Sequence, residues 1–205
     1  YRAKGLNELR KKTIDKARSL AEEYERFHLL QDVFLRQVVY EFENADKLLE
    51  DPIRGMLDEM MSSQIRLNDF VQLYSLRHEI FVTYRSGADF KDDDVKEMLG
   101  GLKNRVAGFE AKVKDSVRLR SQYEMALSDY YNCLSDWEPS FSHLLNLYEA
   151  FQAKPKLKKE YLLRYRILLS NLCTRAFSAG KEQTFFEVLE ELKSLPSNSF
   201  NAEGE

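Results

Sequence analysis

Apolar residues recur at heptad spacing from residue 95 to residue 151. Alternating steps of four and three residues reach Val95, Leu99, Leu102, Val106, Phe109, Val113, Ser116, Arg120, Tyr123, Leu127, Tyr130, Leu134, Trp137, Phe141, Leu144, Tyr148 and Phe151. Only Ser116 and Arg120 interrupt this apolar stripe. A mean spacing of 3.5 residues is typical of a seam between helices. We therefore predict one long helix that lies along another helix.

The core of this seam is predicted at six positions: Leu102, Val106, Phe109, Leu127, Leu134 and Trp137. A charge within an apolar seam is costly unless it is paired. Arg120 is therefore expected to pair with a carboxylate from a neighbouring helix, or to mark the point where the seam opens to solvent. Because the heptad frame continues through Pro139, we expect that proline to kink the helix rather than to end it.

Helical spacing also extends over the rest of the chain. Residues 6–50 contain no Pro and no Gly, and they predict one helix that ends at Asp51-Pro52. A second helix is predicted over 52–85, ended by Gly87, with a turn over 86–91. Asp92, Asp93 and Asp94 suit the start of the next helix, where carboxylates favour the helix dipole; Asp94 and Glu97 also have capping-box spacing.

Two further helices are expected towards the end of the chain. One runs over 157–179 and is followed by Gly180 at the position that favours glycine. The other is short, begins at a capping box formed by Thr184 and Glu187, and ends before Pro196. Residues 197–205 have the polar composition of a disordered tail. Together these patterns predict an all-α fold: an elongated antiparallel bundle or coiled coil of four to six long kinked helices, in one domain over 1–196.

Composition narrows the possible functions. The formal net charge of −3 argues against a dedicated nucleic-acid-binding domain, since such domains are usually strongly basic. The two cysteines, Cys133 and Cys173, suit a reducing compartment, although a single disulfide in an extracellular protein stays open. No apolar run approaches the roughly 18 residues that span a bilayer, and no signal peptide is visible. We expect a cytoplasmic location, either free or peripheral at a membrane. We also expect a chain cut from a longer one, since it begins with Tyr1.

Motifs for catalysis and cofactor binding are absent from the sequence. His28, His78 and His143 lack the partner spacing of a metal site, and Glu25 with His28 forms a single Glu-x-x-His where a di-iron bundle needs two. Phosphate-binding and nucleophile motifs do not occur. We therefore expect no catalytic residue, no metal and no cofactor, which indicates a non-enzymatic protein.

One group of basic residues, here named the basic corner, stands out: Lys154, Lys156, Lys158, Lys159, Arg164 and Arg166. Basic clusters near a surface attract anionic lipids by about 1 kcal/mol per residue. The basic corner is therefore the predicted contact for an anionic partner. The alternative is that these side chains only form a solvated surface.

Two functional hypotheses follow from these patterns. In the first, the chain is a scaffold for protein assembly, and residues 6–86, 92–152 and 157–195 are similar in layout to BAR domains. That likeness implies a homodimer of three long kinked helices with a basic surface that docks on an anionic membrane. In the second, the chain breaks at Pro52, Pro139 and Gly180. It then folds into a compact helical adaptor, regulator or effector that binds a partner peptide or protein.

Overall fold

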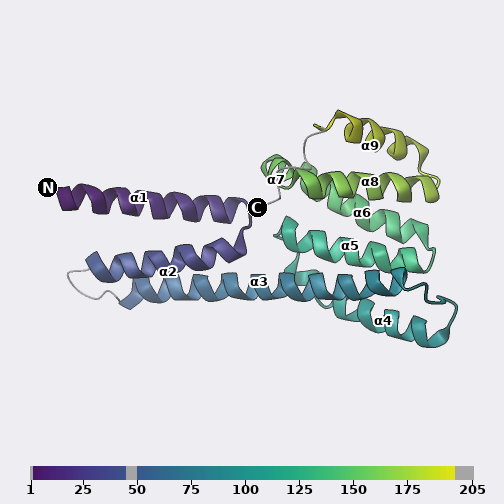
Figure 1. Ribbon diagram of the computed structural model, residues 1–205, viewed down its shortest axis with the longest axis horizontal. Coiled ribbons are helices and arrows are strands. Elements are labelled where there is room, and N and C mark those ends of the chain that lie inside the picture. Colours follow the sequence, from purple (N-terminus) through teal and green to yellow (C-terminus); the bar gives the residue numbers. More distant parts are fainter. Residues whose placement is uncertain (1, 45–49, 197–205) are drawn as a thin grey trace. The chain divides into compact units, whose positions relative to one another are not determined.

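The computed structural model describes residues 2–44 and 50–196, and every regular element in those ranges is helical (Figure 1). About 85% of the described residues are helical, which confirms the predicted all-α class. The elements are α1 (Arg2–Glu23), α2 (Phe27–Asn44), α3 (Glu50–Arg85), α4 (Asp93–Ala107), the 3-10 turn η1 (Glu110–Lys112), α5 (Val117–Cys133), α6 (Trp137–Gln152), α7 (Pro155–Glu160), α8 (Leu162–Ser178) and α9 (Glu182–Ser194). The described ranges therefore hold more and shorter helices than the four to six expected.

Contacts within the chain cluster in two units, which we name unit 1 (Tyr1–Phe70) and unit 2 (Val71–Glu205). The helix α3 contributes its first part to unit 1 and its last part to unit 2. One domain over 1–196 stays a prediction. The expected disordered tail over 197–205 lies outside the described residues.

Unit 1 is built on a hairpin of α1 and α2, where one helix over 6–50 was expected. That prediction is wrong because Glu25 adopts a positive φ of 51°, and the backbone N–H of Arg26 then bonds to the carbonyl of Ala21. This geometry ends helices and usually uses glycine, so the sequence carried no sign of it. The side chain of Gln31 on α2 donates to the carbonyl of Met60 on α3, 3.2 Å away.

The second helix matches its prediction closely. The start of α3 at Glu50 places Pro52 in the first helical turn, where proline is tolerated. The side chains of Asp51 and Pro52 lie outside the described residues, as does the segment 45–49 before them. At the other end, Gly87 has a positive φ of 71° just beyond the helix.

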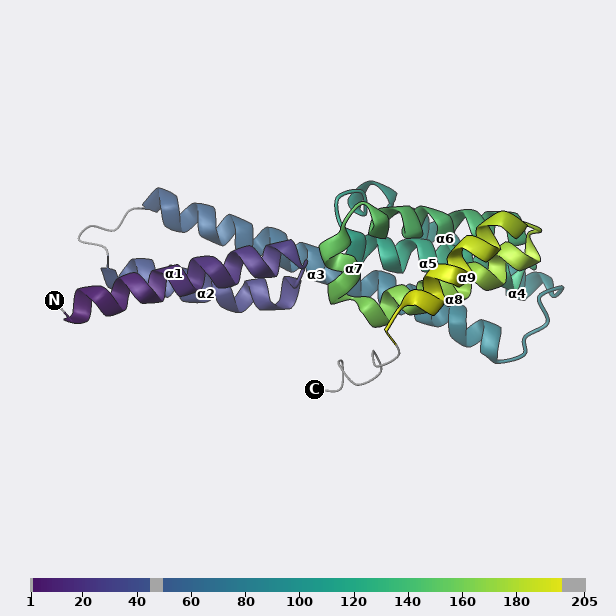
Figure 2. The ribbon, with the colours of Figure 1, turned by 90° about the horizontal axis from the view of Figure 1, so that it is seen from above.

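The predicted uninterrupted helix over 95–151 is wrong. These residues instead form α4, α5 and α6, which fold back on one another (Figures 1 and 2). Unit 2 is therefore a bundle rather than an elongated coiled coil. Ser116 is the N-cap of α5, and its hydroxyl accepts a hydrogen bond from the N–H of Leu119 at 3.1 Å. The second break falls at Ser135, with φ of 56°, and Pro139 lies in the first turn of α6. The kink expected at Pro139 is thus a full break four residues earlier, at Ser135.

The last helices also differ in detail from the prediction. Tyr161 separates α7 from α8, where one helix was expected. Gly180 has a positive φ of 68° after α8, as predicted. The helix α9 begins at Glu182, so Thr184 lies inside the helix and does not cap it. The predicted cap of α4 is also misplaced: Asp92, rather than Asp94, is the N-cap, and its side chain accepts a hydrogen bond from the N–H of Asp94 at 2.8 Å.

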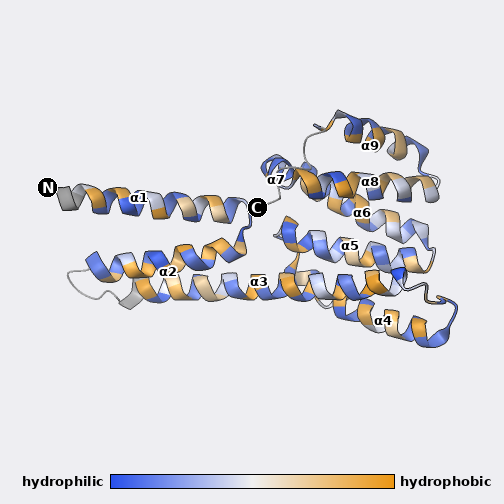
Figure 3. Cartoon of the chain, viewed as in Figure 1, coloured by the Kyte–Doolittle hydropathy of each residue, from blue (hydrophilic) through white to orange (hydrophobic). Residues whose placement is uncertain are grey.

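The core of unit 2 lies where α3, α5, α6 and α8 meet. Hydrophobic and hydrophilic residues alternate along these helices (Figure 3). The largest fully buried side chains of this unit are Leu73, Ile80, Leu99, Leu119, Leu144, Leu147, Phe151, Tyr165, Leu168, Leu169 and Leu172. Among the described helices, none is both long and apolar enough to cross a bilayer.

Candidate functional site

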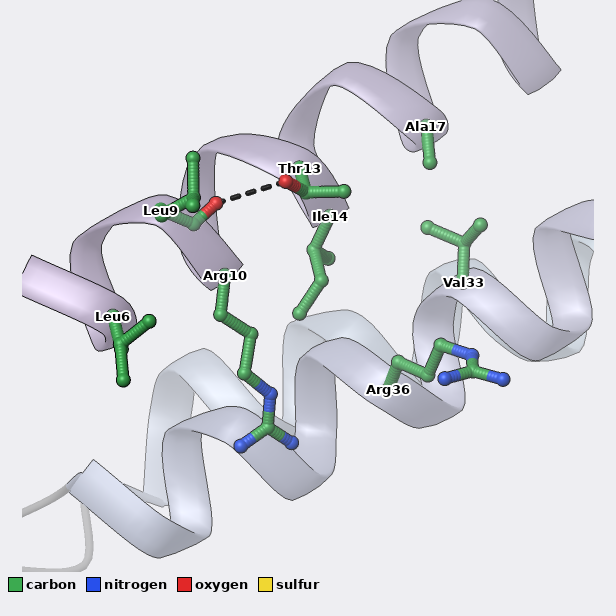
Figure 4. Close-up of a pocket in the computed structure, with 8 residues that line it drawn as sticks. All are labelled: Leu6, Leu9, Arg10, Thr13, Ile14, Ala17, Val33 and Arg36. Carbon is green, nitrogen blue, oxygen red and sulfur yellow. Dashed lines mark hydrogen bonds between the residues drawn. The ribbon is translucent and has the colours of Figure 1, made fainter. Parts of the chain in front are cut away.

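The clearest hollow in unit 1 is a groove between α1 and α2, with a volume of about 500 Å³. Its apolar lining comes from both helices, and Figure 4 shows Ile14 extending from α1 towards α2 and Val33 extending from α2 towards α1. Leu6 and Leu9, at 67% and 61% exposure, lie at the same groove. The hydroxyl of Thr13 donates to the carbonyl of Leu9 at 2.9 Å, so that polar group is already satisfied.

Apolar exposure in unit 1 extends well beyond this groove. Among the described residues of this unit, the buried apolar side chains are few: Ile14, Ala21, Phe27, Leu30 and Phe34. Its exposed large apolar side chains are twice as many: Leu6, Leu9, Leu20, Leu29, Leu35, Val39, Phe42, Leu57, Met61 and Ile65. We name the second set the apolar surface of unit 1. An unusual number of exposed apolar side chains on one unit favours an interaction site there.

Charged groups border the groove. Arg10 forms an ion pair with Glu43 at the end of α2, and its guanidinium lies 5.6 Å from the ring centre of Tyr40. Arg36, also at the groove, is exposed and has no hydrogen bond or ion pair within the described part of the chain. Arg18 on α1 pairs with Glu59 on α3. The helix α1 is thus basic where it faces acidic positions of α2 and α3.

The basic corner of unit 2 is largely engaged in contacts within the chain. Lys154 donates to the carbonyl of Asp115 at 3.3 Å, and Arg166 donates to the carbonyls of Leu195 and Pro196. The guanidinium of Arg164 lies 5.7 Å from the ring centre of Tyr161. Lys156 and Lys159 are exposed. The binding of an anionic partner at this corner stays a prediction.

Lys158 belongs to a polar network centred on Glu191 of α9. Its ammonium pairs with the Glu191 carboxylate, which also accepts hydrogen bonds from the hydroxyls of Tyr148 (2.8 Å) and Tyr165 (2.7 Å). Burial acts to raise the pKa of Glu191, but the hydrogen bonds from Lys158 and its other donors lower it to about 2. Burial and the bond to Glu191 raise the pKa of Tyr148 to about 12. This network joins four helices of unit 2 and is structural.

The six predicted seam residues have different environments. Leu102, Val106, Phe109 and Leu127 are buried. Trp137 is only half-buried at the first turn of α6. Leu134 is 37% exposed because it caps the C-terminus of α5 at the break, and it does not lie in a buried seam.

Arg120 pairs within its own helix, not with a carboxylate from a neighbouring helix as the first alternative expected. Its Nε lies 3.3 Å from Glu124 Oε1, and the guanidinium is half-buried. His143 of α6 lies 2.7 Å from the other oxygen of the same carboxylate. Glu124 is 5% exposed, so this buried carboxylate links α5 to α6. Nothing in its sequence context distinguished Glu124 from a solvated helix residue.

The residues considered for metals and disulfides take ordinary roles. In the ranges that the structure describes, no three His, Cys, Asp or Glu side chains are placed to hold a metal ion. Cys133 and Cys173 are both buried and unbridged. Burial and the charge of Asp129 raise the pKa of the Cys133 thiol to about 11, which disfavours the nucleophilic thiolate.

Comparison with known proteins gives one distant similarity. No family model matches the chain, and no solved structure matches it. A glycylpeptide N-tetradecanoyltransferase from Candida glabrata is 29% identical over 147 residues, which cover 64% of this chain. The chain spans less than a third, 31%, of the length of that curated protein. This extent of similarity does not assign the chain to a family.

Proposed function

We propose that this chain is a non-enzymatic helical scaffold that assembles with a second copy of itself through the apolar surface of unit 1. The observation that carries the proposal is the imbalance among the described residues of that unit, of which ten large apolar side chains are exposed and five apolar ones are buried. Burying one Leu or Met side chain contributes about 1.5–3 kcal/mol. A second copy that covers this surface would supply the core that unit 1 lacks by itself.

Charge supports a second copy as the occupant. A two-fold interface uses the same surface on both subunits, so that surface must complement itself. Unit 1 carries basic residues on α1 that have no acidic partner in the described residues, among them Lys11, Lys12 and Lys16. It also carries acidic residues on α2 and α3, among them Glu41 and Asp58. The basic α1 of one copy can therefore face the acidic positions of the other.

The proposal is tested by sedimentation velocity over a concentration series, with charges placed on the apolar surface. We expect the wild type to form dimers and Leu9→Glu to remain monomeric, with Met61→Glu weakening association at least about tenfold. Phe177→Glu is the matched control, because Phe177 is 75% exposed but lies on α8 of unit 2. A wild type that stays monomeric at all concentrations, or a control that dissociates as Leu9→Glu does, would contradict the proposal.

A second measurement tests the non-enzymatic part. The similar protein from Candida glabrata is named for transferring a tetradecanoyl group to a glycyl peptide. We expect no such transfer when this chain is incubated with an activated tetradecanoyl donor and a peptide that begins with glycine. Turnover above the rate without protein would overturn this part of the proposal while leaving the self-association result intact.

A further inference from the structure

A polar cavity of about 150 Å³ lies within unit 2, between the last part of α3, α5 and α8. Its lining includes two arginines, two asparagines, one aspartate and one tyrosine: Arg77, Tyr84, Asp129, Asn132, Asn171 and Arg175. Interior cavities in proteins are usually apolar or filled by ordered water. A cavity lined with this many hydrogen-bond donors therefore indicates a polar occupant.

One pair in the cavity is already satisfied. The Nε of Arg77 donates to Asp129 Oδ2 at 3.1 Å. Burial raises the pKa of Asp129, and the charge and hydrogen bond of Arg77 oppose that rise. In the part of the chain that the structure describes, the two terminal nitrogens of Arg77 form no hydrogen bond.

The remaining donors lack partners. The Nε of Arg175 is buried and has no hydrogen bond, although the Trp137 ring lies 5.8 Å from its guanidinium. Asn132 and Asn171 also line the cavity, and neither side chain forms a hydrogen bond within the described ranges. Leaving buried polar groups unpaired costs free energy, and native structures rarely do so. The buried Nε of Arg175 is therefore the donor that most needs a ligand, and the two asparagines beside it offer further donors.

The charge balance gives the sign of that ligand. Two arginines and one aspartate leave the cavity with one excess positive charge. Burial lowers the pKa of Arg175, which reflects the cost of keeping this cation away from water. An anion between Arg175 and the two asparagines would offset that cost. A cation would find the one carboxylate, Asp129, already held by Arg77.

The geometry points to a phosphate group as the occupant, and we propose that this cavity is a phosphate-binding site. The volume of about 150 Å³ is several times the roughly 30 Å³ of one water molecule, so the cavity has room for a polyatomic anion. Each arginine offers a fork of N–H donors and each asparagine two, which suits several oxygens at once. Tyr84 is 44% exposed, so a phosphomonoester could extend past it to solvent. This inference does not rest on self-association.

Calorimetric titration of the whole chain with inorganic phosphate and with glycerol phosphate tests the proposal. We expect saturable binding of at least one of them, and Arg175→Met should weaken it by about tenfold or more, since a hydrogen bond to a charged group is lost. Asn132→Asp should abolish binding, because it adds a like charge in nearly the same shape. Tighter binding of glycerol phosphate would identify a phosphomonoester as the ligand, and tighter binding of the ion would identify free phosphate.

Matched variants keep the test decisive. Arg85→Met removes an exposed arginine from α3 outside the cavity and should change the affinity less than about twofold. Circular dichroism shows whether Arg175→Met and Asn132→Asp are folded. If either variant is not, Asn171→Asp, at a half-buried position, is used in its place. No saturable binding of either phosphate compound, equal binding by the folded variants, or equally tight binding of acetate would overturn the proposal.

Discussion

Replacing Glu191 with Gln should destabilise unit 2 without changing the shape of the side chain. The carboxylate of Glu191 pairs with Lys158 and accepts hydrogen bonds from Tyr148 and Tyr165. A glutamine amide has only one acceptor oxygen, so its NH₂ group would face a donor. The variant therefore removes the charge and leaves at least one of these donors unpaired.

The size of this effect follows from the pKa of Glu191, which is lowered from 4.5 to about 2. At about 1.36 kcal/mol per pKa unit, the ionised form would contribute at most about 3 kcal/mol at pH 7. The Glu191 side chain retains 22% exposure, and solvent screening weakens such interactions. We therefore expect Glu191→Gln to lower the free energy of unfolding by about 2 kcal/mol at pH 7.

The pH dependence gives a second, independent check. Because the pKa in the folded state lies below that in the unfolded state, the stabilisation is present above about pH 4.5 and is lost as the pH falls towards 2. The difference between wild type and variant should thus shrink to less than half by pH 3. Urea unfolding followed by the fluorescence of Trp137, the single tryptophan, measures it at both pH values.

The control is Glu190→Gln, since Glu190 lies next along α9 and its carboxylate contacts only the exposed Lys193. Exposed pairs contribute little, so this variant should lose less than about 0.5 kcal/mol. The reasoning is refuted if Glu191→Gln behaves like this control, or if its loss is the same at pH 7 and pH 3.

Three further outcomes are expected. Leu127→Ala should lower the free energy of unfolding by about 2–5 kcal/mol because Leu127 is buried, whereas Leu134→Ala at an exposed position should lower it by less than about 1 kcal/mol. Equal losses in urea unfolding would show that Leu134 is packed in the core as Leu127 is. Ser116→Ala should cost about 1 kcal/mol through loss of the α5 N-cap, also read from urea unfolding, and no loss would mean that the cap does not stabilise α5. Changing the exposed Lys156 and Lys159 of the basic corner to Glu should reduce co-sedimentation with anionic liposomes, which in the wild type should weaken steeply as salt rises; if the wild type does not sediment with them, the corner has no membrane role.

Glycine and the proline at position 52 predicted the helix boundaries best, whereas both predicted capping boxes were misplaced. The limits of α3, Gly87 after it and Gly180 after α8 were all predicted from these residues. The breaks at Glu25 and Ser135 were missed, because both are non-glycine residues with positive φ. Such conformations depend on the packing around them and leave no mark in the local sequence.

The heptad stripe misled because its spacing has two explanations. Apolar residues at steps of three and four suit one long seam, and they suit equally a series of short helices that each bury one face. Ser116 interrupted the stripe because it caps a new helix, and that polar residue was the available signal. The exposure of Leu9 on the apolar surface of unit 1 and the burial of Asn132 at the polar cavity of unit 2 both depend on which helices pack together. Neither candidate site was therefore predictable from sequence alone.

The central claim, that the apolar surface of unit 1 is covered by a second copy, is tested most directly by methionine oxidation. Met61 on that surface is 62% exposed, and Met98 on α4 of unit 2 is 46% exposed and serves as an internal control. Peroxide converts exposed methionine to its sulfoxide, and mass spectrometry reads both rates in one sample across a concentration series. We predict that Met61 oxidation slows as the chain dimerises while Met98 oxidation stays constant. A ratio of the two rates that does not change with concentration would contradict the account.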